Sequence, residues 1–423
     1  MLGAMRWARL AVAIALAGCR GPSAPAAPVR AGSGGPTAAA ATGTPGPSKG
    51  TVEGGVRPHH EDVVVECGAK IPDSADDDTR VSALLDEANN DLEQGQYAAA
   101  WTCADRATDL APTSVEANHL RGAALAALGR DQEAQTAYSL ALALDPDDPE
   151  TLRAVADFYI NGKGERGRDA LRLGLELAER GSRRAIARRR RNAPLAADLA
   201  VLEAQALNDL GRSDEALERV DAALRLAPMR GDALHEKGVA LFDLSRFADA
   251  KTALSKALTV QPDDAYTHQM LGLTLEQLGE GASAETELQK AVTLAPGELW
   301  PPVLIPIPEF QKEIDAVIAT LPPERQARVK AIKVEIADLP DPADLKAVTP
   351  PFPPTILGLY RGPVGRTPLP GDEPPSIVLY RKNLARAVKT RTELTEQIRD
   401  TLLHEIGHLE GLDEDDLRRR GME

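Results

Sequence analysis

Residues 231–264 read GDALHEKGVALFDLSRFADAKTALSKALTVQPDD, and the following residues 265–298 read AYTHQMLGLTLEQLGEGASAETELQKAVTLAPGE. The two stretches carry alanines, a small turn residue and a proline in the same phase. Prolines recur with this step of 34 residues in two groups, at Pro112 and Pro146 and at Pro228, Pro262 and Pro296. A fixed period of this length indicates one supersecondary unit copied along the chain, and a proline stops each unit because it has no N–H to donate. The middle of the chain is therefore predicted to be a stacked helical array.

Small residues recur inside each unit, with Gly122, Gly238 and Gly272 where two helices would cross and alanines such as Ala216 and Ala223 in the second helix. This pattern resembles tetratricopeptide repeats, in which small side chains let antiparallel helices approach closely. The resemblance implies a solenoid over residues 81–297 whose curved surface holds a protein or peptide partner. Regular repeats are expected at 81–114, 115–148, 197–230, 231–264 and 265–297, with a degenerate repeat at 149–196.

An arginine-rich stretch, with Arg183, Arg184 and Arg188 to Arg191, lies in the degenerate repeat. It is either an anion or nucleic-acid patch or a solvated extension of a helix balanced by acidic neighbours. The formal net charge of −15 gives no electrostatic reason to bind nucleic acid. The second interpretation is favoured, and no nucleic-acid partner is expected.

The N-terminus has the features of an export signal. Arg6 and Arg9 flank the entry to an apolar run at residues 10–17, which is too short to span a bilayer. The run ends in Leu16-Ala17-Gly18-Cys19, which resembles the lipobox of bacterial lipoproteins. The resemblance implies a signal peptide over residues 1–19 and a lipid on the Cys19 sulfur, whereas the alternative is an ordinary apolar N-terminus with a chance cysteine.

Residues 20–60 are mostly Gly, Pro, Ala, Ser and Thr, which cannot bury enough apolar surface to offset the entropy of ordering. They are expected to form a disordered tether, joined by a connecting segment at 61–80. A lipid anchor to a membrane implies a cell-envelope protein facing the periplasm. By resemblance to lipoprotein sorting rules, Arg20 after the cysteine favours the outer over the inner membrane.

Two further cysteines, Cys67 and Cys103, lie in the connecting segment and the first repeat. In an oxidising periplasm they would form one disulfide. The alternative is two free thiols, and the sequence leaves both open.

The composition changes after the last repeat. Residues 298–308 form a Pro-rich linker, and residues 309–423 form a different domain. A helix is predicted at 310–321, and strands are predicted at 332–336 and 377–380 with a Pro-rich loop at 350–375 between them. A last helix is predicted from about Glu393.

The last predicted helix carries His404-Glu405-Ile406-Gly407-His408, an HExxH pattern. Two imidazoles one helical turn apart share one face and can reach the same tetrahedral Zn²⁺ ion. Glu405 beside them is placed to act as the general base of a metal-assisted peptide hydrolysis. His404 and His408 are the predicted metal ligands.

The third ligand is predicted to be a carboxylate, because the remaining histidines fall in the tether and the repeats. Glu414 stands ten residues after His404, at the position of the third ligand in HExxHxxGxxH enzymes. Asp413 and Asp415 remain alternatives. Gly411 is expected to turn the chain back toward the metal with a positive φ.

Residues 309–423 resemble the small bacterial zincin-like metallopeptidases called minimal zincins. The similarity extends to residues 334–340, which resemble the first strand, to residues 357–362, which resemble a loop segment, and to residues 377–384 before the metal helix. It implies a compact α+β zincin fold with zinc. The family more often has aspartate as third ligand and an aromatic or apolar residue at the position of Glu410. The overall fold class is thus mainly α, a helical solenoid followed by a small α+β domain.

The predicted function is a lipid-anchored zinc metallopeptidase whose repeats recruit a protein partner or substrate. The alternative is a scaffold lipoprotein whose C-terminal zinc domain is structural or inactive. Glu405 favours the enzyme, because a structural zinc site takes four ligands and has no use for a base beside them.

Overall fold

The computed structural model describes residues 66–72, 74–162, 167–187, 192–363 and 374–420. The expected signal peptide, Cys19 and the tether at 20–60 lie outside these residues, as do Arg188 to Arg191. Within the described part of the chain, no helix combines the length and the apolar character that a membrane crossing requires.

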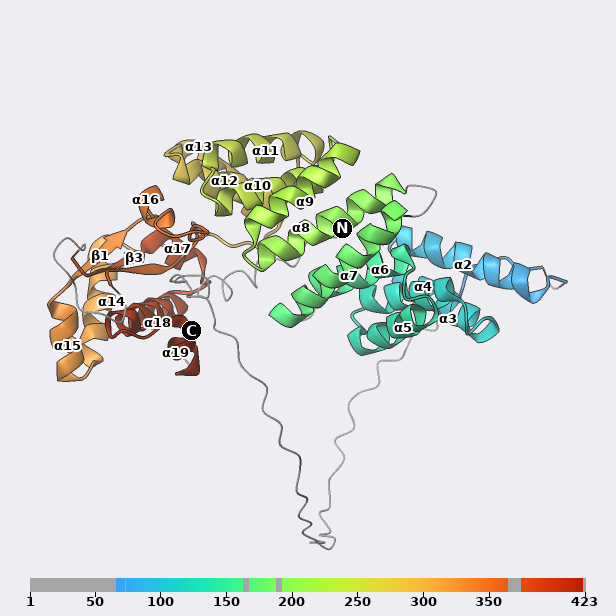
Figure 1. Ribbon diagram of the computed structural model, residues 1–423, viewed down its shortest axis with the longest axis horizontal. Coiled ribbons are helices and arrows are strands. Elements are labelled where there is room, and N and C mark those ends of the chain that lie inside the picture. Colours follow the sequence, from blue (N-terminus) through green and yellow to red (C-terminus); the bar gives the residue numbers. More distant parts are fainter. Residues whose placement is uncertain (1–65, 73, 163–166, 188–191, 364–373, 421–423) are drawn as a thin grey trace, which may run out of the picture.

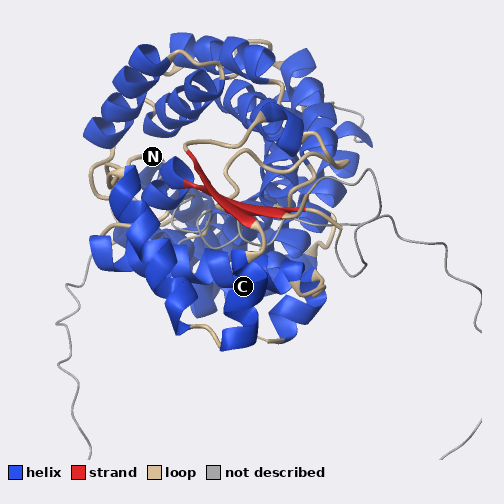
Figure 2. Ribbon diagram, turned by 90° about the vertical axis from the view of Figure 1, so that its left-hand side faces the viewer, coloured by secondary structure: helices blue, strands red, loops and turns tan. Residues whose placement is uncertain are grey.

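Helices fill the first two thirds of the described chain, stacked as pairs into an arc that Figures 1 and 2 show from two directions. The pairs are α2 (Asp77–Glu93) with α3 (Tyr97–Leu110), α4 (Val115–Ala127) with α5 (Asp131–Leu144), α6 (Pro149–Asn161) with α7 (Arg168–Ala187), α8 (Ala193–Asp209) with α9 (Ser213–Leu226), α10 (Gly231–Asp243) with α11 (Phe247–Val260), and α12 (Ala265–Gln277) with α13 (Gly281–Leu294). The pair α6–α7 occupies the stretch expected to hold the degenerate repeat. Its second helix has 20 residues, whereas α5, α9, α11 and α13 have 14 each.

Close helix packing explains the small residues of the repeats. A Cβ atom added to Gly238 would lie 2.4 Å from Leu254, and one added to Gly272 would lie 2.6 Å from Leu288. Those leucines sit on the second helix of the same pair. The expectation that glycine permits the close helix crossing is therefore confirmed.

The turn inside each regular pair needs a left-handed residue. Gly279 takes φ 77° there, and glycines one or more repeats earlier take similar angles. The pair α10–α11 has Ser245 at this position, with φ 55°, and its side chain is 4% exposed. A non-glycine residue pays a steric cost in this conformation.

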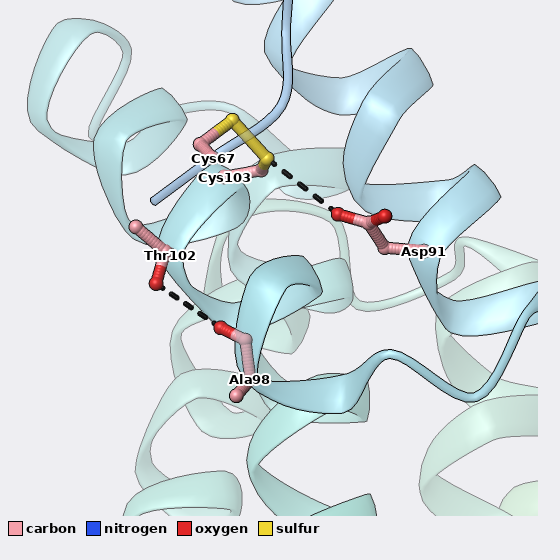
Figure 3. The surroundings of a disulfide bond; sticks show 5 residues. All are labelled: Cys67, Asp91, Ala98, Thr102 and Cys103. Atoms are coloured by element: carbon pink, nitrogen blue, oxygen red, sulfur yellow. Dashed lines mark hydrogen bonds between the residues drawn. A yellow bond between two sulfur atoms is a disulfide. The ribbon is translucent and has the colours of Figure 1, made fainter. Parts of the chain in front are cut away.

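A disulfide joins Cys67 to Cys103 across 36 residues of sequence. Figure 3 shows that it fastens the segment before α2 to α3, with the Asp91 carboxylate of α2 lying 3.8 Å from the Cys103 sulfur. Burial, followed by the charge of Glu87, raises the pKa of Asp91. Of the two states left open by the sequence, the structure has the bridge.

The C-terminal domain, residues 307–420, combines short helices with a three-stranded sheet. Its elements are α14 (Ile307–Thr320), α15 (Pro323–Lys330), β1 (Lys333–Ala337), α16 (Pro342–Leu345), β2 (Gly358–Arg361), β3 (Ser376–Tyr380), α17 (Arg381–Arg386), α18 (Arg391–Leu409) and α19 (Glu414–Arg419). The strand order is β1-β3-β2, with β1 parallel and β2 antiparallel to the fully buried β3. The predicted fold class, a mainly helical array followed by a small α+β region, is confirmed.

One strand falls where the sequence predicted loop. β2 lies inside the Pro-rich stretch 350–375 and pairs Gly358 with Leu379 and Tyr360 with Ile377. A four-residue strand between proline-rich flanks is too short to show a periodic apolar pattern. Its extended conformation is set by its pairing with β3.

The last repeats and the C-terminal domain share one cluster of buried side chains. The cluster includes Leu241, Phe242, Met270 and Leu273 from the repeats and Leu345, Phe352, Ile356 and Tyr380 from the C-terminal domain. Glu276 of α12 adds a polar contact, because it pairs with both Lys382 and Arg386 of α17. The domain is therefore seated on the end of the array.

Candidate metal centre

The long helix α18 carries the HExxH residues. Its N-terminus is capped by Thr390, whose hydroxyl accepts a hydrogen bond from the Glu393 N–H at 3.2 Å. Leu394, Ile398 and Leu402 are each at most 1% exposed and hold one face of the helix in the domain core. Burial of this face fixes the rotation of α18, and with it the direction of both histidines.

His404 and His408 lie one turn apart, with their Nε2 atoms 3.2 Å from each other. Glu414 comes from the next helix, and its Oε1 atom lies 3.6 Å from the His404 Nε2 and 3.4 Å from the His408 Nε2. The three residues form a group whose ligand atoms could hold one metal ion.

The turn between α18 and α19 brings Glu414 back to the histidines. Gly411 has φ 87°, as predicted from the sequence. Asp413 instead caps α19, accepting a hydrogen bond from the Asp416 N–H at 2.8 Å. Asp415 pairs with Arg418 at 2.7 Å. The two alternative ligands, Asp413 and Asp415, therefore point to other partners.

The His408 ring is held by its backbone neighbour. Its Nδ1 lies 2.9 Å from the carbonyl oxygen of Leu412, and only a protonated Nδ1 can donate to a carbonyl. In the neutral ring this contact keeps the proton on Nδ1 and leaves Nε2 free to bind a metal. A Cβ on Gly407 would lie 2.3 Å from Leu417, so this glycine also lets α19 pack closely on α18.

Glu405 is 6% exposed and lies beneath the edge strand β2. The backbone N–H of Tyr360 donates to its carboxylate. A Cβ on Gly358 would lie 3.0 Å from the Glu405 Oε1 and 2.8 Å from the Thr401 Cγ2, so the glycine permits this close approach. Burial raises the pKa of Glu405, which makes its carboxylate a stronger base than in water.

Glu414 and His408 shift each other's pKa values toward the charged forms. Burial acts to raise the pKa of Glu414, but hydrogen bonds and charges from His404 and His408 lower it to about 2. Burial acts to lower the pKa of His408, but the contact with Glu414, the charge of Glu405 and the Leu412 carbonyl together outweigh it and raise this pKa. The carboxylate is ionised at any physiological pH.

The residues fit a zinc ion. Ligands at about 2.1 Å around a tetrahedral centre lie about 3.4 Å from one another, close to the three separations observed here. The Glu414 Oε1 is buried, and its close neighbours are the two imidazole nitrogens that would share the ion with it. Two imidazole nitrogens and a carboxylate oxygen are also the donor set of many catalytic zinc sites.

Other residues near the site have structural contacts. Glu410, which replaces the more common aromatic or apolar residue, pairs with Arg325 of α15 through both carboxylate oxygens at 2.8 Å. The Tyr380 ring is fully buried, with its hydroxyl 3.4 Å from Asp344. Tyr360 is 7% exposed and contributes its backbone N–H to Glu405. Sequence reasoning missed the parts played by Gly358 and Leu412, because both act through backbone position.

Comparisons with known proteins divide the chain in the same way. Residues 329–422 match the family described as zincin-like metallopeptidase, and residues 85–149 and 235–298 match a tetratricopeptide repeat family. No curated protein sequence matches the chain.

Several solved structures resemble the repeat array. PilF of Pseudomonas aeruginosa is 16% identical, with a TM-score of 0.44, over 52% of this chain and 94% of its own. PilW, described as a type IV pilus biogenesis factor, is also 16% identical with a TM-score of 0.44, over 51% of this chain and 94% of its own. The chain therefore carries tetratricopeptide repeats between residues 85 and 298 and a zincin-like metallopeptidase domain at residues 329–422.

Proposed function

We propose that this protein is a zinc-dependent peptidase in which His404, His408 and Glu414 hold the metal and Glu405 is the general base. One observation carries the proposal: a buried carboxylate stands directly beside a cluster of three ligand atoms. Three protein ligands leave a zinc ion one open position for chemistry, whereas structural zinc sites are closed by four.

The residues of this site have separate roles in the proposed reaction. A zinc ion bound here would polarise the scissile carbonyl and lower the pKa of water toward about 7. The Glu405 carboxylate takes a proton from the attacking water as the new C–O bond forms, and returns it to the amine nitrogen as the C–N bond breaks. The Tyr360 N–H and the close strand β2 keep that carboxylate in place.

The proposal extends to the rest of the chain. The repeats would recruit a protein or peptide, since stacked repeats present an extended curved binding surface. A lipid on Cys19 would tether the enzyme in the cell envelope facing the periplasm, at the outer membrane rather than the inner. The disulfide between Cys67 and Cys103 supports an oxidising compartment, because such bonds rarely persist in the cytosol.

The test compares the purified chain with its Glu405→Gln variant for zinc content and for cleavage of casein or a peptide library. Glu396→Gln, at an exposed position of the same helix, is the matched control. We expect one zinc per chain in all three proteins and loss of cleavage in Glu405→Gln alone. Zinc without cleavage in the unmodified chain would instead support a scaffold with a structural or inactive zinc domain.

A further inference from the structure

The edge strand β2 lies between the metal helix and the repeats. On one side, Gly358 faces Glu405 of α18, and the Tyr360 N–H donates to the same carboxylate. On the other side, Leu359 belongs to the buried cluster that also contains Phe242 of α10. Successive side chains of a strand point to opposite faces of a sheet, so β2 contacts both structures at once. The place of β2 is therefore set from two directions, and one of them is the repeat array.

The loop that leads into β2 is fastened to α17 by one buried side chain. The Asn383 Nδ2 donates to the carbonyl oxygens of Pro354 and Ile356, at 2.9 Å and 2.7 Å. Asn383 is 7% exposed, and a buried carbonyl that loses its donor is costly to leave unpaired. The next carbonyl, that of Leu357, accepts a hydrogen bond from the Tyr380 N–H. Asn383 therefore fixes the chain two residues before β2 begins.

The same short helix, α17, is held by the repeats. Glu276 of α12 has a side chain that is 8% exposed; its Oε1 lies 2.9 Å from the Lys382 Nζ, and its other oxygen binds Arg386. Lys382 directly precedes Asn383, and Arg386 follows it by almost one turn of α17. Ion pairs shielded from water are screened less than exposed ones, and removing one partner leaves the others without compensation. One carboxylate of the array thus holds the helix from which Asn383 reaches the loop.

We infer that the repeat array positions the proposed general base, Glu405, by way of Glu276, α17, Asn383 and β2. Glu276 and Asn383 are positioning residues in this arrangement, because they act on Glu405 only through β2. The inference rests on the proposed function, since it concerns the base of that reaction. Coupling between distant sites is carried by contiguous packed and hydrogen-bonded elements of this kind. The repeats then serve the active site directly, besides any partner that they recruit.

A purely adhesive role for these contacts makes a different prediction. If Glu276 and its two cations only fastened the domain to the array, their loss would destabilise β1, β2 and β3 alike. If they position β2, their loss acts mainly on β2, because β1 lies at the opposite edge of the sheet and pairs with β3. The opening of β2 relative to β1 therefore separates the two roles.

Hydrogen exchange with mass spectrometry measures that opening in the full-length chain and does not depend on cleavage. In Glu276→Gln and in Asn383→Leu, we expect the amides of residues 358–361 to exchange at least about fivefold faster than in the unmodified chain, with residues 333–337 little changed. The matched control is Glu280→Gln at the start of α13, whose ion pair with Lys251 stays within the repeats. It should change neither segment.

Peptide cleavage supplies a second measurement. In Glu276→Gln, kcat should fall at least about tenfold while KM and zinc content stay the same, because a displaced base slows the chemical step without removing a ligand. Combining Glu276→Gln with Gly358→Ala, which disturbs β2 from the side of α18, should cost less than the sum of the two separate effects.

Exchange of β2 that is unchanged in both variants, or raised equally in β1 and β2, would overturn the inference and leave the peptidase proposal standing. A chain that binds zinc but cleaves nothing would count against the peptidase proposal alone, because the exchange measurement still decides whether the repeats position β2. If Glu276→Gln does not fold, Lys382→Met removes only one of the two cations and is expected to give a weaker change in the same direction.

Discussion

Five acidic side chains follow His408 within eight residues, and four of them are engaged elsewhere. Glu410 pairs with Arg325, Asp413 caps α19, and Asp415 and Asp416 pair with Arg418 and Arg419. Glu414 is the one that faces the two imidazoles. All five side chains carry the same charge, so their geometry selects the ligand among these carboxylates.

Replacing Glu414 tests this selection. In Glu414→Gln the site loses an ionised ligand, and we expect zinc affinity to fall at least about 100-fold, more than the loss of an outer partner costs. Asp415→Asn, the matched change one residue away, should leave zinc affinity as it is. Titration against a chromophoric chelator measures both, and zinc loss in Asp415→Asn instead would show that the ligand was wrongly assigned.

Ser245 provides a stability prediction at the same scale. It combines a left-handed backbone with a buried hydroxyl that has no partner in the described chain. Ser245→Gly removes both costs while adding backbone entropy to the unfolded state, and we expect a net gain of about 1 kcal/mol. The reverse change at the equivalent turn, Gly279→Ser, should destabilise. Urea unfolding followed by circular dichroism measures both, and a less stable Ser245→Gly would contradict the account.

At the scale of elements, the sequence was most informative where a pattern repeats. Five of the helix pairs follow from a 34-residue period because each unit repeats the same packing solution, and the sixth, α6–α7, fills the stretch where that period breaks. The strands β1 and β3 and the metal helix were also predicted from local apolar patterns. β2 was not, since its four residues owe their conformation to β3 and their position to Gly358. Glu414 and the turn at Gly411 were predicted from the spacing of the motif, but Asp413 and Asp415 stayed open as ligands because helical periodicity does not encode the cap at Asp413 or the ion pair of Asp415.

The close approach of β2 to α18 predicts a selective defect. In Gly358→Ala the new methyl group would meet Thr401 and Glu405 at 3.0 Å or less, so the strand or the carboxylate must shift. We expect kcat/KM for peptide cleavage to fall at least about tenfold, because a displacement near 1 Å misplaces a general base. Zinc content should be unchanged, since no ligand moves directly.

The control for this change is Gly281→Ala, where an added Cβ meets open space at the start of α13. It should keep full activity. Normal cleavage by Gly358→Ala would show that the glycine does not set the position of Glu405.

At the scale of the whole molecule, the C-terminal domain packs against the repeats. Its side chains Phe352, Ile356 and Tyr380 belong to the same buried cluster as Phe242 and Met270 of the repeats. The sequence pattern did not predict this shared core, because the Pro-rich linker suggested separate domains. Long-range packing of this kind depends on how the two surfaces meet, which local periodicity does not specify.

Fragments of the chain test the shared core. A fragment of residues 298–423 would lose the repeat side chains that share its buried cluster, whereas a fragment of residues 231–423 would keep them. We expect the shorter fragment to unfold at a lower urea concentration or to aggregate. Hydrogen exchange would locate the loss on β3 and the loops around Phe352. Equal stability of the two fragments would show that the domain folds independently of the repeats.

The bridge between Cys67 and Cys103 also has a mechanical consequence. It closes a covalent ring that contains α2. Tension applied to the chain ahead of Cys67 therefore passes through the two sulfur atoms into α3. The residues between the two cysteines carry none of that load. A pull from the N-terminal side therefore begins to unravel the fold in α3 while the bond is intact, and reaches α2 first once the bond is reduced.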